Sequence, residues 1–154
     1  MAVNKLGHRP FESKTRHGSW TKICDDMMDS KAWQSLSRSQ RCLYLELKRK
    51  FTAKVVNGKI ISDNAKDISM PTSEATKLYS NLRLFRTDID ALINCGFIDC
   101  IRGGYTTRTA NIYGFSDRWI KYGQPDYEVS YKVARPQRMK KKETTVDDEP
   151  ERDT

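Results

Sequence analysis

The first strong helical pattern in the chain lies between residues 38 and 52. Three apolar residues recur there four positions apart: Leu43, Leu47 and Phe51. This spacing places them on one face of a helix and leaves charged residues on the other face. The Ser37 hydroxyl can accept a hydrogen bond from the backbone of Gln40, whose side chain can reach back. The pattern predicts an amphipathic helix from about Arg38 to Thr52, preceded by a short helix or helical turns within residues 25–34.

Two further helices are predicted in the middle of the chain. The first opens at Pro71, with Thr72 or Ser73 as its cap, and runs to about residue 78 or 79. The second spans residues 82–94, where apolar residues again recur at helical spacing: Phe85, Ile89 and Leu92. Gly96 is expected to end it, because glycine adopts the left-handed conformation at almost no cost.

Short β-like segments separate and follow these helices. They cover residues 59–62, 68–70, 97–101 and 110–115. Asn57–Gly58 is a strong turn signal, and residues 102–105 form a turn between the last two segments. The resulting order is helix, short strand, helix, turn, helix, hairpin. It predicts an α+β fold: a winged helix-turn-helix, with a three-helix core and a small β-hairpin wing.

The chain of 154 residues is expected to hold one domain with two tails. Residues 1–18 form a flexible basic N-terminal arm, and residues 19–123 form the winged-helix domain. Residues 124–154 are expected to be a disordered tail that is basic from 132 to 142 and then acidic. Such segments bury too little apolar surface to offset the entropy of ordering them.

The formal net charge of +8 bears on the binding partner of the protein rather than on its fold. A basic surplus of this size fits a polyanion, most commonly nucleic acid, although ordinary solubility charge is the alternative explanation. No apolar run is long enough to span a membrane, and the N-terminus lacks the apolar centre of a secretory signal. We therefore expect a cytoplasmic protein with no membrane partner and reduced cysteines.

Metal and cofactor chemistry is not expected. The two closest cysteines, Cys95 and Cys100, have four residues between them rather than the two of a common zinc pair. Together with Cys42 they are interpreted as small buried apolar residues. The acidic pair Asp88 and Asp90 is interpreted as surface charge.

Enzymatic activity is not expected either. The chain has no glycine-rich phosphate loop followed by Lys-Ser/Thr. Its only histidines, His8 and His17, lie in the polar N-terminal segment, away from any candidate nucleophile. Tyrosines are plentiful, but a relaxase-type tyrosine nucleophile would lack the histidine metal cluster that such nucleases need.

Residues 20–123 resemble winged-helix proteins of bacterial phages, plasmids and integrative elements. The matching pieces are DSKAWQSLS at 29–37, ALINCGFI at 91–98 and ANIYGFSDRW at 110–119. The resemblance implies a DNA-binding protein acting in replication, partition, transfer or transcriptional control of a bacterial mobile element. It leaves open a second hypothesis, because such domains also act as protein-interaction adaptors that do not bind DNA directly.

The helix at 82–94 is the candidate recognition helix, because the second helix of a helix-turn-helix enters the major groove. With Phe85, Ile89 and Leu92 facing the core, polar residues remain outside: Asn81, Arg83, Arg86, Thr87 and Asp90. Arginine can read guanine with two hydrogen bonds, and asparagine can read adenine. The alternative is an ordinary solvated helix face.

The predicted wing carries residues suited to phosphate or minor-groove contact. They are Arg102, Tyr105, Thr106, Thr107 and Arg108. The alternative for this segment is an ordinary polar hairpin loop. The leading hypothesis is thus sequence-specific binding of double-stranded DNA, with other replication or transfer proteins as further candidate partners and no cofactor.

Overall fold

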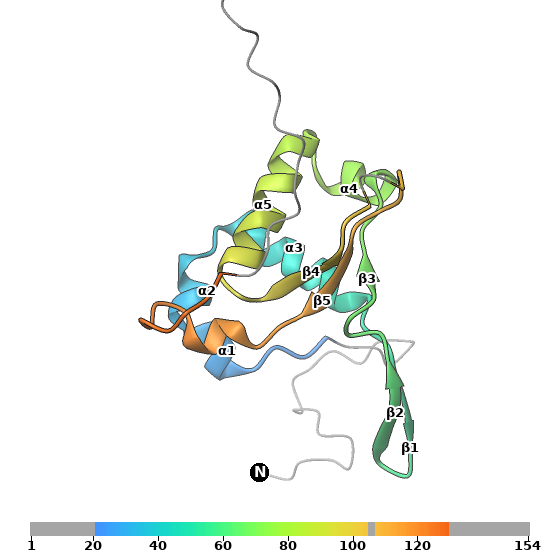
Figure 1. The fold of residues 1–154 in the computed structure, drawn as a ribbon, viewed down its shortest axis with the longest axis vertical. Coiled ribbons are helices and arrows are strands. Elements are labelled where there is room, and N and C mark those ends of the chain that lie inside the picture. The colour runs from blue at the N-terminus through green and yellow to red at the C-terminus, as the bar shows by residue number, and fades with distance from the viewer. Residues whose placement is uncertain (1–20, 105–106, 130–154) are drawn as a thin grey trace, which may run out of the picture.

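The computed structural model describes residues 21–104 and 107–129. This part of the chain is α+β, with five α-helices and two small antiparallel sheets (Figure 1). The helices are α1 (Asp25–Asp29), α2 (Lys31–Ser35), α3 (Arg38–Arg49), α4 (Thr72–Leu78) and α5 (Leu82–Asn94), with a 3-10 turn η1 (Arg118–Lys121). None of the described helices has the length and apolar character needed to cross a membrane.

The larger sheet has the strand order β3-β5-β4. Its strands are β3 (Ile68–Ser69), β4 (Ile98–Arg102) and β5 (Ile112–Phe115). Ile68 of β3 lies opposite Tyr113 of β5, so the short strand before α4 pairs with the last strand of the domain. The smaller sheet is a hairpin of β1 (Ala53–Val56) and β2 (Lys59–Asp63) alone.

The core lies where α2, α3 and α5 meet the larger sheet. Its largest fully buried side chains come from α3, α5, β3, β4 and the turn between α5 and β4: Leu43, Leu47, Ile68, Leu92, Ile93, Phe97 and Ile98. Phe97 is central, because its ring makes an edge contact with Trp33 and stacks on Trp119. Such aromatic pairs each add about 0.5–1.5 kcal/mol beyond the area they bury. The predicted core-facing positions of α3 and α5 are confirmed, with Phe51 as the exception.

The short helix or helical turns expected within 25–34 are two five-residue helices, α1 and α2, which meet at Ser30, whose Oγ accepts a hydrogen bond from Trp33 N at the start of α2. Two other predicted helix ends are wrong. The helix expected to reach Thr52 ends at Arg49, so Phe51 is 38% exposed. Neither Thr72 nor Ser73 caps α4, because its N-cap is Pro71, which has no side-chain hydrogen bond.

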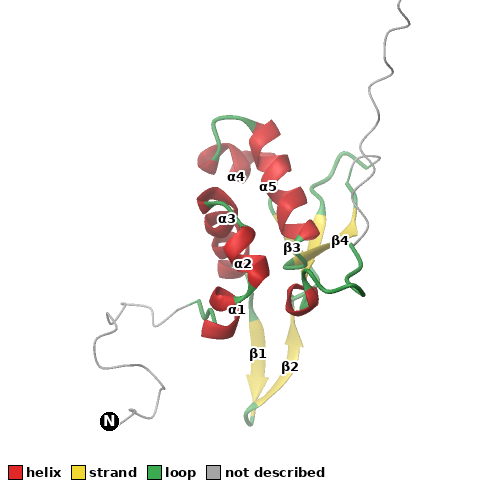
Figure 2. Ribbon diagram, turned by 90° about the vertical axis from the view of Figure 1, so that its left-hand side faces the viewer, coloured by secondary structure: helices red, strands yellow, loops and turns green. Residues whose placement is uncertain are grey.

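Helix α3 ends before Thr52, and the residues that follow it are held by the side chain of Asn64. The Asn64 side chain donates to the carbonyl of Lys50 at 2.9 Å and accepts from the amide of Thr52 at 2.7 Å. These contacts join the two ends of the β1–β2 hairpin, which projects from one end of the molecule in both views (Figures 1 and 2). Its turn, Asn57–Gly58, has positive φ values of 50° and 75°. That is the geometry of the two-residue hairpin turn that Asn-Gly favours.

Gly96 ends α5 as expected, with φ +81°, and a second reason for glycine exists there. A Cβ at this position would lie 2.6 Å from the backbone nitrogen of Trp119 and 2.7 Å from the carbonyl carbon of Arg118. The absence of a side chain therefore lets η1 pack directly on the end of α5. The helix C-cap and the last segment of the domain depend on the same residue.

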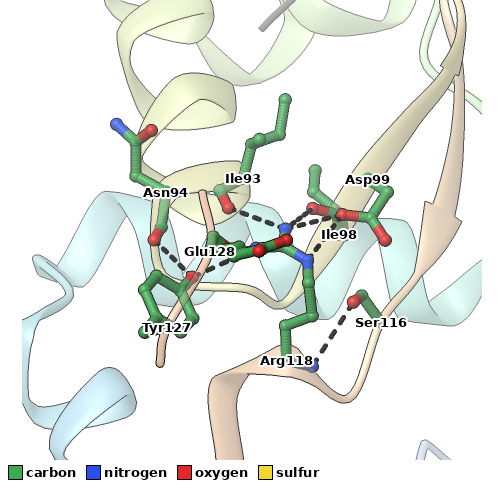
Figure 3. A network of polar contacts seen from close by, with 8 residues as sticks. All are labelled: Ile93, Asn94, Ile98, Asp99, Ser116, Arg118, Tyr127 and Glu128. Atoms are coloured by element: carbon green, nitrogen blue, oxygen red, sulfur yellow. Dashed lines mark hydrogen bonds and ion pairs between the residues drawn. The ribbon is translucent and has the colours of Figure 1, made fainter. Parts of the chain in front are cut away.

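Arg118 fastens the segment after β5 to the body of the domain (Figure 3). Its guanidinium binds Asp99 at 2.6 Å and donates to the carbonyl of Ile93 at 3.1 Å. It also donates to Tyr127 Oη at 3.2 Å, and that hydroxyl donates to the carbonyl of Asn94 at 2.6 Å. These contacts hold residues beyond Gly123, the boundary expected from the sequence, against the end of α5.

Candidate nucleic-acid interface

The α5 helix is positioned by a cap at its start and by its apolar face. Asn81 is the N-cap, and its Oδ1 accepts a hydrogen bond from the Arg83 amide at 2.7 Å. Ile89 and Leu92 are buried in the core below. Asn81 was expected to be a base reader, but the structure also gives it this structural task. Its Nδ2 donors and the second lone pair of Oδ1 are not used by the cap.

The outer face of α5 carries the predicted reading residues. Arg83, Arg86 and Thr87 are all exposed, as expected from the helical spacing. The Thr87 hydroxyl donates to the carbonyl of Arg83 at 3.0 Å, so it can offer an outside ligand only acceptor positions. The Arg83 side chain makes no hydrogen bond or ion pair with another residue of the described ranges. It is the most available donor on this face.

The β4–β5 hairpin forms the second part of the candidate interface. Its loop is closed by the Gly104 N–H, which donates to Asn111 Oδ1 at 2.8 Å, and by the Thr109 N–H, which donates to the Gly104 carbonyl at 3.0 Å. A Cβ on Gly104 would lie 2.0 Å from the Thr109 carbonyl oxygen, so this position requires glycine. At the Gly103–Gly104 turn expected from the sequence, the backbone of Gly104 therefore passes close to that of Thr109.

The predicted wing residues differ in how they are held. Arg102 and Arg108 are exposed, and Arg108 has φ 53°, a left-handed conformation at the loop. Thr107 is exposed too, with its hydroxyl 2.8 Å from that of Thr109. Tyr105, like its neighbour Thr106, lies outside the described residues.

The two parts of the interface lie at the same end of the molecule. Both views place the start of α5 and the tip of the β4–β5 hairpin away from the end that carries β1–β2 (Figures 1 and 2). The two elements that carry the exposed arginines therefore lie toward one end, with Arg83 and Arg86 on the first half of α5, Arg102 at the end of β4 and Arg108 in the loop after it. Positive charge at the start of a helix adds to the positive end of the helix dipole, which favours an anionic ligand.

A buried carboxylate behind this face was not expected. Asp88 is only 7% exposed and accepts a hydrogen bond of 2.7 Å from the Tyr79 hydroxyl. Burial, then this hydrogen bond, raise the pKa of Tyr79 well above its usual range, so the hydroxyl stays protonated and donates. The pair joins Tyr79, the C-cap of α4, to α5. The available signal was the position of Asp88, three residues after the core residue Phe85.

The surface beside this pair is partly apolar. Leu78 and Leu84 are 49% and 55% exposed at the edge of a shallow hollow between α3 and the α4–α5 turn. Cys42, expected to be buried, is exposed and lines the same hollow. Cys42 lies on α3 at this hollow rather than in the core. The spacing of apolar residues along the sequence does not show that the hollow exists.

The described residues contain no group of three or more histidine, cysteine or acidic side chains that could hold a metal ion. No known protein family, curated protein or solved structure matches this chain.

Proposed function

We propose that this protein binds double-stranded DNA through a winged helix-turn-helix, with α5 as the recognition helix and the β4–β5 hairpin as the wing. The order α3, β3, α4, α5, β4, β5, with the β1–β2 hairpin inserted between α3 and β3, and the β3-β5-β4 sheet are compatible with that arrangement. The proposed setting is sequence-specific binding in replication, transfer or transcriptional control of a bacterial mobile element. That setting is what the resemblance of residues 20–123 implies.

The observation that carries the proposal is that α5 and the hairpin, which carry the exposed arginines, lie toward one end of the molecule. Arg83, near the start of α5, is placed to reach a base edge if that end of the helix leads into the major groove. Arg108, on the hairpin loop at the same end of the molecule, is proposed to contact the phosphate backbone or the minor groove.

The test separates base reading from backbone holding. A cognate site is first selected from a library of random duplexes. Arg83→Ala should then weaken binding to that site by about 1–3 kcal/mol while changing random-duplex binding little. Arg108→Ala should weaken both duplexes alike and reduce the slope of log affinity against log salt by about 0.9. Arg49→Ala is the matched control, because it removes the same charge from an exposed position on α3.

Two outcomes would contradict the proposal. A library that yields no enriched site would remove sequence-specific binding. An enriched site that Arg83→Ala binds as tightly as the parent would remove α5 as the reader.

The protein-interaction adaptor is the second candidate function. It is favoured by Leu78 and Leu84, which leave apolar surface beside the start of α5. If no duplex binds at all, this surface becomes the better candidate for the working face.

A further inference from the structure

The β1–β2 hairpin, called the arm below, is held at its base by hydrogen bonds and has no part in the proposed function. Every residue of its two strands is exposed. At its base, Asn64 contacts both the Lys50 carbonyl and the Thr52 amide, and its own N–H donates to the Thr52 carbonyl at 3.2 Å. The arm therefore leaves the domain in a defined direction, although the core does not cover it.

The strand register divides the arm into two faces. Val55 lies opposite Ile60, and Val56 lies opposite Lys59. The register shifts between Lys54 and Val55, where Ile61 of β2 has no partner and β1 continues without an extra residue. Because successive side chains of β1 point to opposite faces, Lys54 shares one face with Val56 and its partner Lys59, while Val55 shares the other with Ile60. Two long cationic side chains on one face can contact neighbouring phosphates.

The exposed charges of the arm beyond its base are positive. Lys54 and Lys59 are both exposed, whereas Lys66 and Asp67, side by side at the base, offset each other. The one carboxylate of the two strands, Asp63, accepts a hydrogen bond from the Ala65 amide at 2.9 Å at the base of the arm, away from its tip. The ribbon beyond the base therefore offers cations and aliphatic side chains to a ligand.

The size of the arm argues against a second copy of this chain as the occupant. Strands of four and five residues are only about 13–17 Å long at ~3.3 Å per residue. A partner docked on one face of a ribbon of that length and two strands in width buries less than the roughly 600 Å² per partner of a stable interface. A polyanion needs no such area, because lysine–phosphate contacts supply the binding.

We propose that the β1–β2 hairpin is a second DNA contact, with Lys54 and Lys59 on the phosphate backbone. A two-stranded ribbon fits the major groove, and aliphatic side chains beside cations can press against base steps in the minor groove. The arm lies at the opposite end of the molecule from the start of α5 and the β4–β5 tip (Figures 1 and 2). It therefore contacts a segment of duplex other than the one held by α5. This inference rests on the proposed function.

The test measures binding of the full chain to a fluorescein-labelled duplex of arbitrary sequence over a range of salt. Lys54→Gln/Lys59→Gln removes two phosphate contacts and should reduce the log–log salt slope by about 1.8. The advantage of the parent over this variant should therefore shrink about twelvefold as salt rises from about 50 to about 200 mM. Lys22→Gln/Lys31→Gln, which removes two exposed lysines elsewhere, should leave the slope unchanged. All these positions are exposed, so thermal melting should match the parent.

The same substitutions are repeated in an Arg83→Ala background to separate the two surfaces. Equal loss in both backgrounds supports an independent second contact. An unchanged salt slope in Lys54→Gln/Lys59→Gln overturns the inference and leaves the proposed function standing if Arg83→Ala still weakens the cognate site. A parent that binds no duplex removes the proposed function and, with it, the DNA contact of the arm.

Two other occupants are outcomes of the same design. A concentration-dependent dimer in sedimentation that is lost in Val55→Thr/Ile60→Thr, with the salt slope unchanged in the lysine variant, would overturn the inference in favour of a second copy. Co-sedimentation with phosphatidylserine vesicles that depends on Lys54 and Lys59, without an effect on duplex binding, would overturn it in favour of a membrane surface.

Discussion

The two hairpins of this protein share a secondary structure and differ in what supports them. In β4–β5, Ile98 and Tyr113 are buried in the core, and β3 pairs with the outer edge of β5. In β1–β2, Ile60 is 60% exposed and neither strand has a further partner among the described residues. Burial in the core therefore stabilises the strands of the β4–β5 hairpin. The Asn57–Gly58 turn and the β-branched side chains favour the strands of the β1–β2 hairpin.

The comparison also separates two ways of presenting charge. Arg102 and Arg108 stand on a hairpin held by the core, which fixes their position relative to α5. Lys54 and Lys59 stand on an arm held only at its base by Asn64. The first arrangement suits contacts that must keep register with a recognition helix. The second suits backbone contacts that tolerate small displacements.

The largest expected effect comes from the same substitution in the two hairpins. Ile98→Ala, at a side chain that is 1% exposed, should lower the free energy of unfolding by about 2–5 kcal/mol, because it leaves a cavity in the core. Ile60→Ala should change it by no more than about 0.5 kcal/mol. Chemical denaturation monitored by tryptophan fluorescence measures both. Similar losses in the two variants would mean that β1–β2 is part of the core unit.

A second effect distinguishes the glycines of the two loops. Gly104→Ala places a Cβ against the Thr109 carbonyl, so the loop must shift, at a cost of about 1–3 kcal/mol. Gly58 has open space around it, and Gly58→Ala meets only the left-handed penalty of about 1 kcal/mol at φ +75°. Thermal melting should register the first substitution strongly. Hydrogen exchange of the β1–β2 amides should register the second, while the global melting temperature stays close to that of the parent.

Much of the helical framework could be predicted from the sequence, because its signals are local. The capping box forms as expected, with the Gln40 amide 3.3 Å from Ser37 Oγ and the Ser37 amide 2.8 Å from Gln40 Oε1. The bounds of α5, 82–94, agree with the apolar spacing, and Gly96 takes the left-handed conformation. Each of these features depends on residues within one or two helical turns.

What the sequence could not give depends on contacts between distant residues. Helix α3 ends at Arg49 because Asn64, far along the chain, binds the Lys50 carbonyl and the Thr52 amide. Asp88 is buried rather than a surface charge because Tyr79 folds over it from the end of α4. Neither partner can be recognised from spacing alone.

The candidate site divides in the same way. The outward direction of Arg83, Arg86 and Thr87 follows from helical periodicity and agrees with their exposure. The N-cap role of Asn81 and the hydrogen bond of Thr87 back to Arg83 depend on side-chain geometry that periodicity does not define. Contact of these residues with DNA stays a prediction.

The smallest expected effect tests the base of the arm directly. Asn64→Ala removes the two side-chain hydrogen bonds that join the ends of β1–β2, at a net cost of about 1 kcal/mol. Because the hairpin contributes little buried surface, this cost should fall on local opening rather than on global unfolding. The β1–β2 amides should therefore exchange about fivefold faster, while those of β4–β5 are unchanged. Asn64→Asp keeps the acceptor for the Thr52 amide and loses the donor to the Lys50 carbonyl, so it should lie between parent and Asn64→Ala. If Asn64→Ala instead lowers the protection of both hairpins equally, the arm and the core unfold together, and the contrast between the two hairpins is one of position and not of stability.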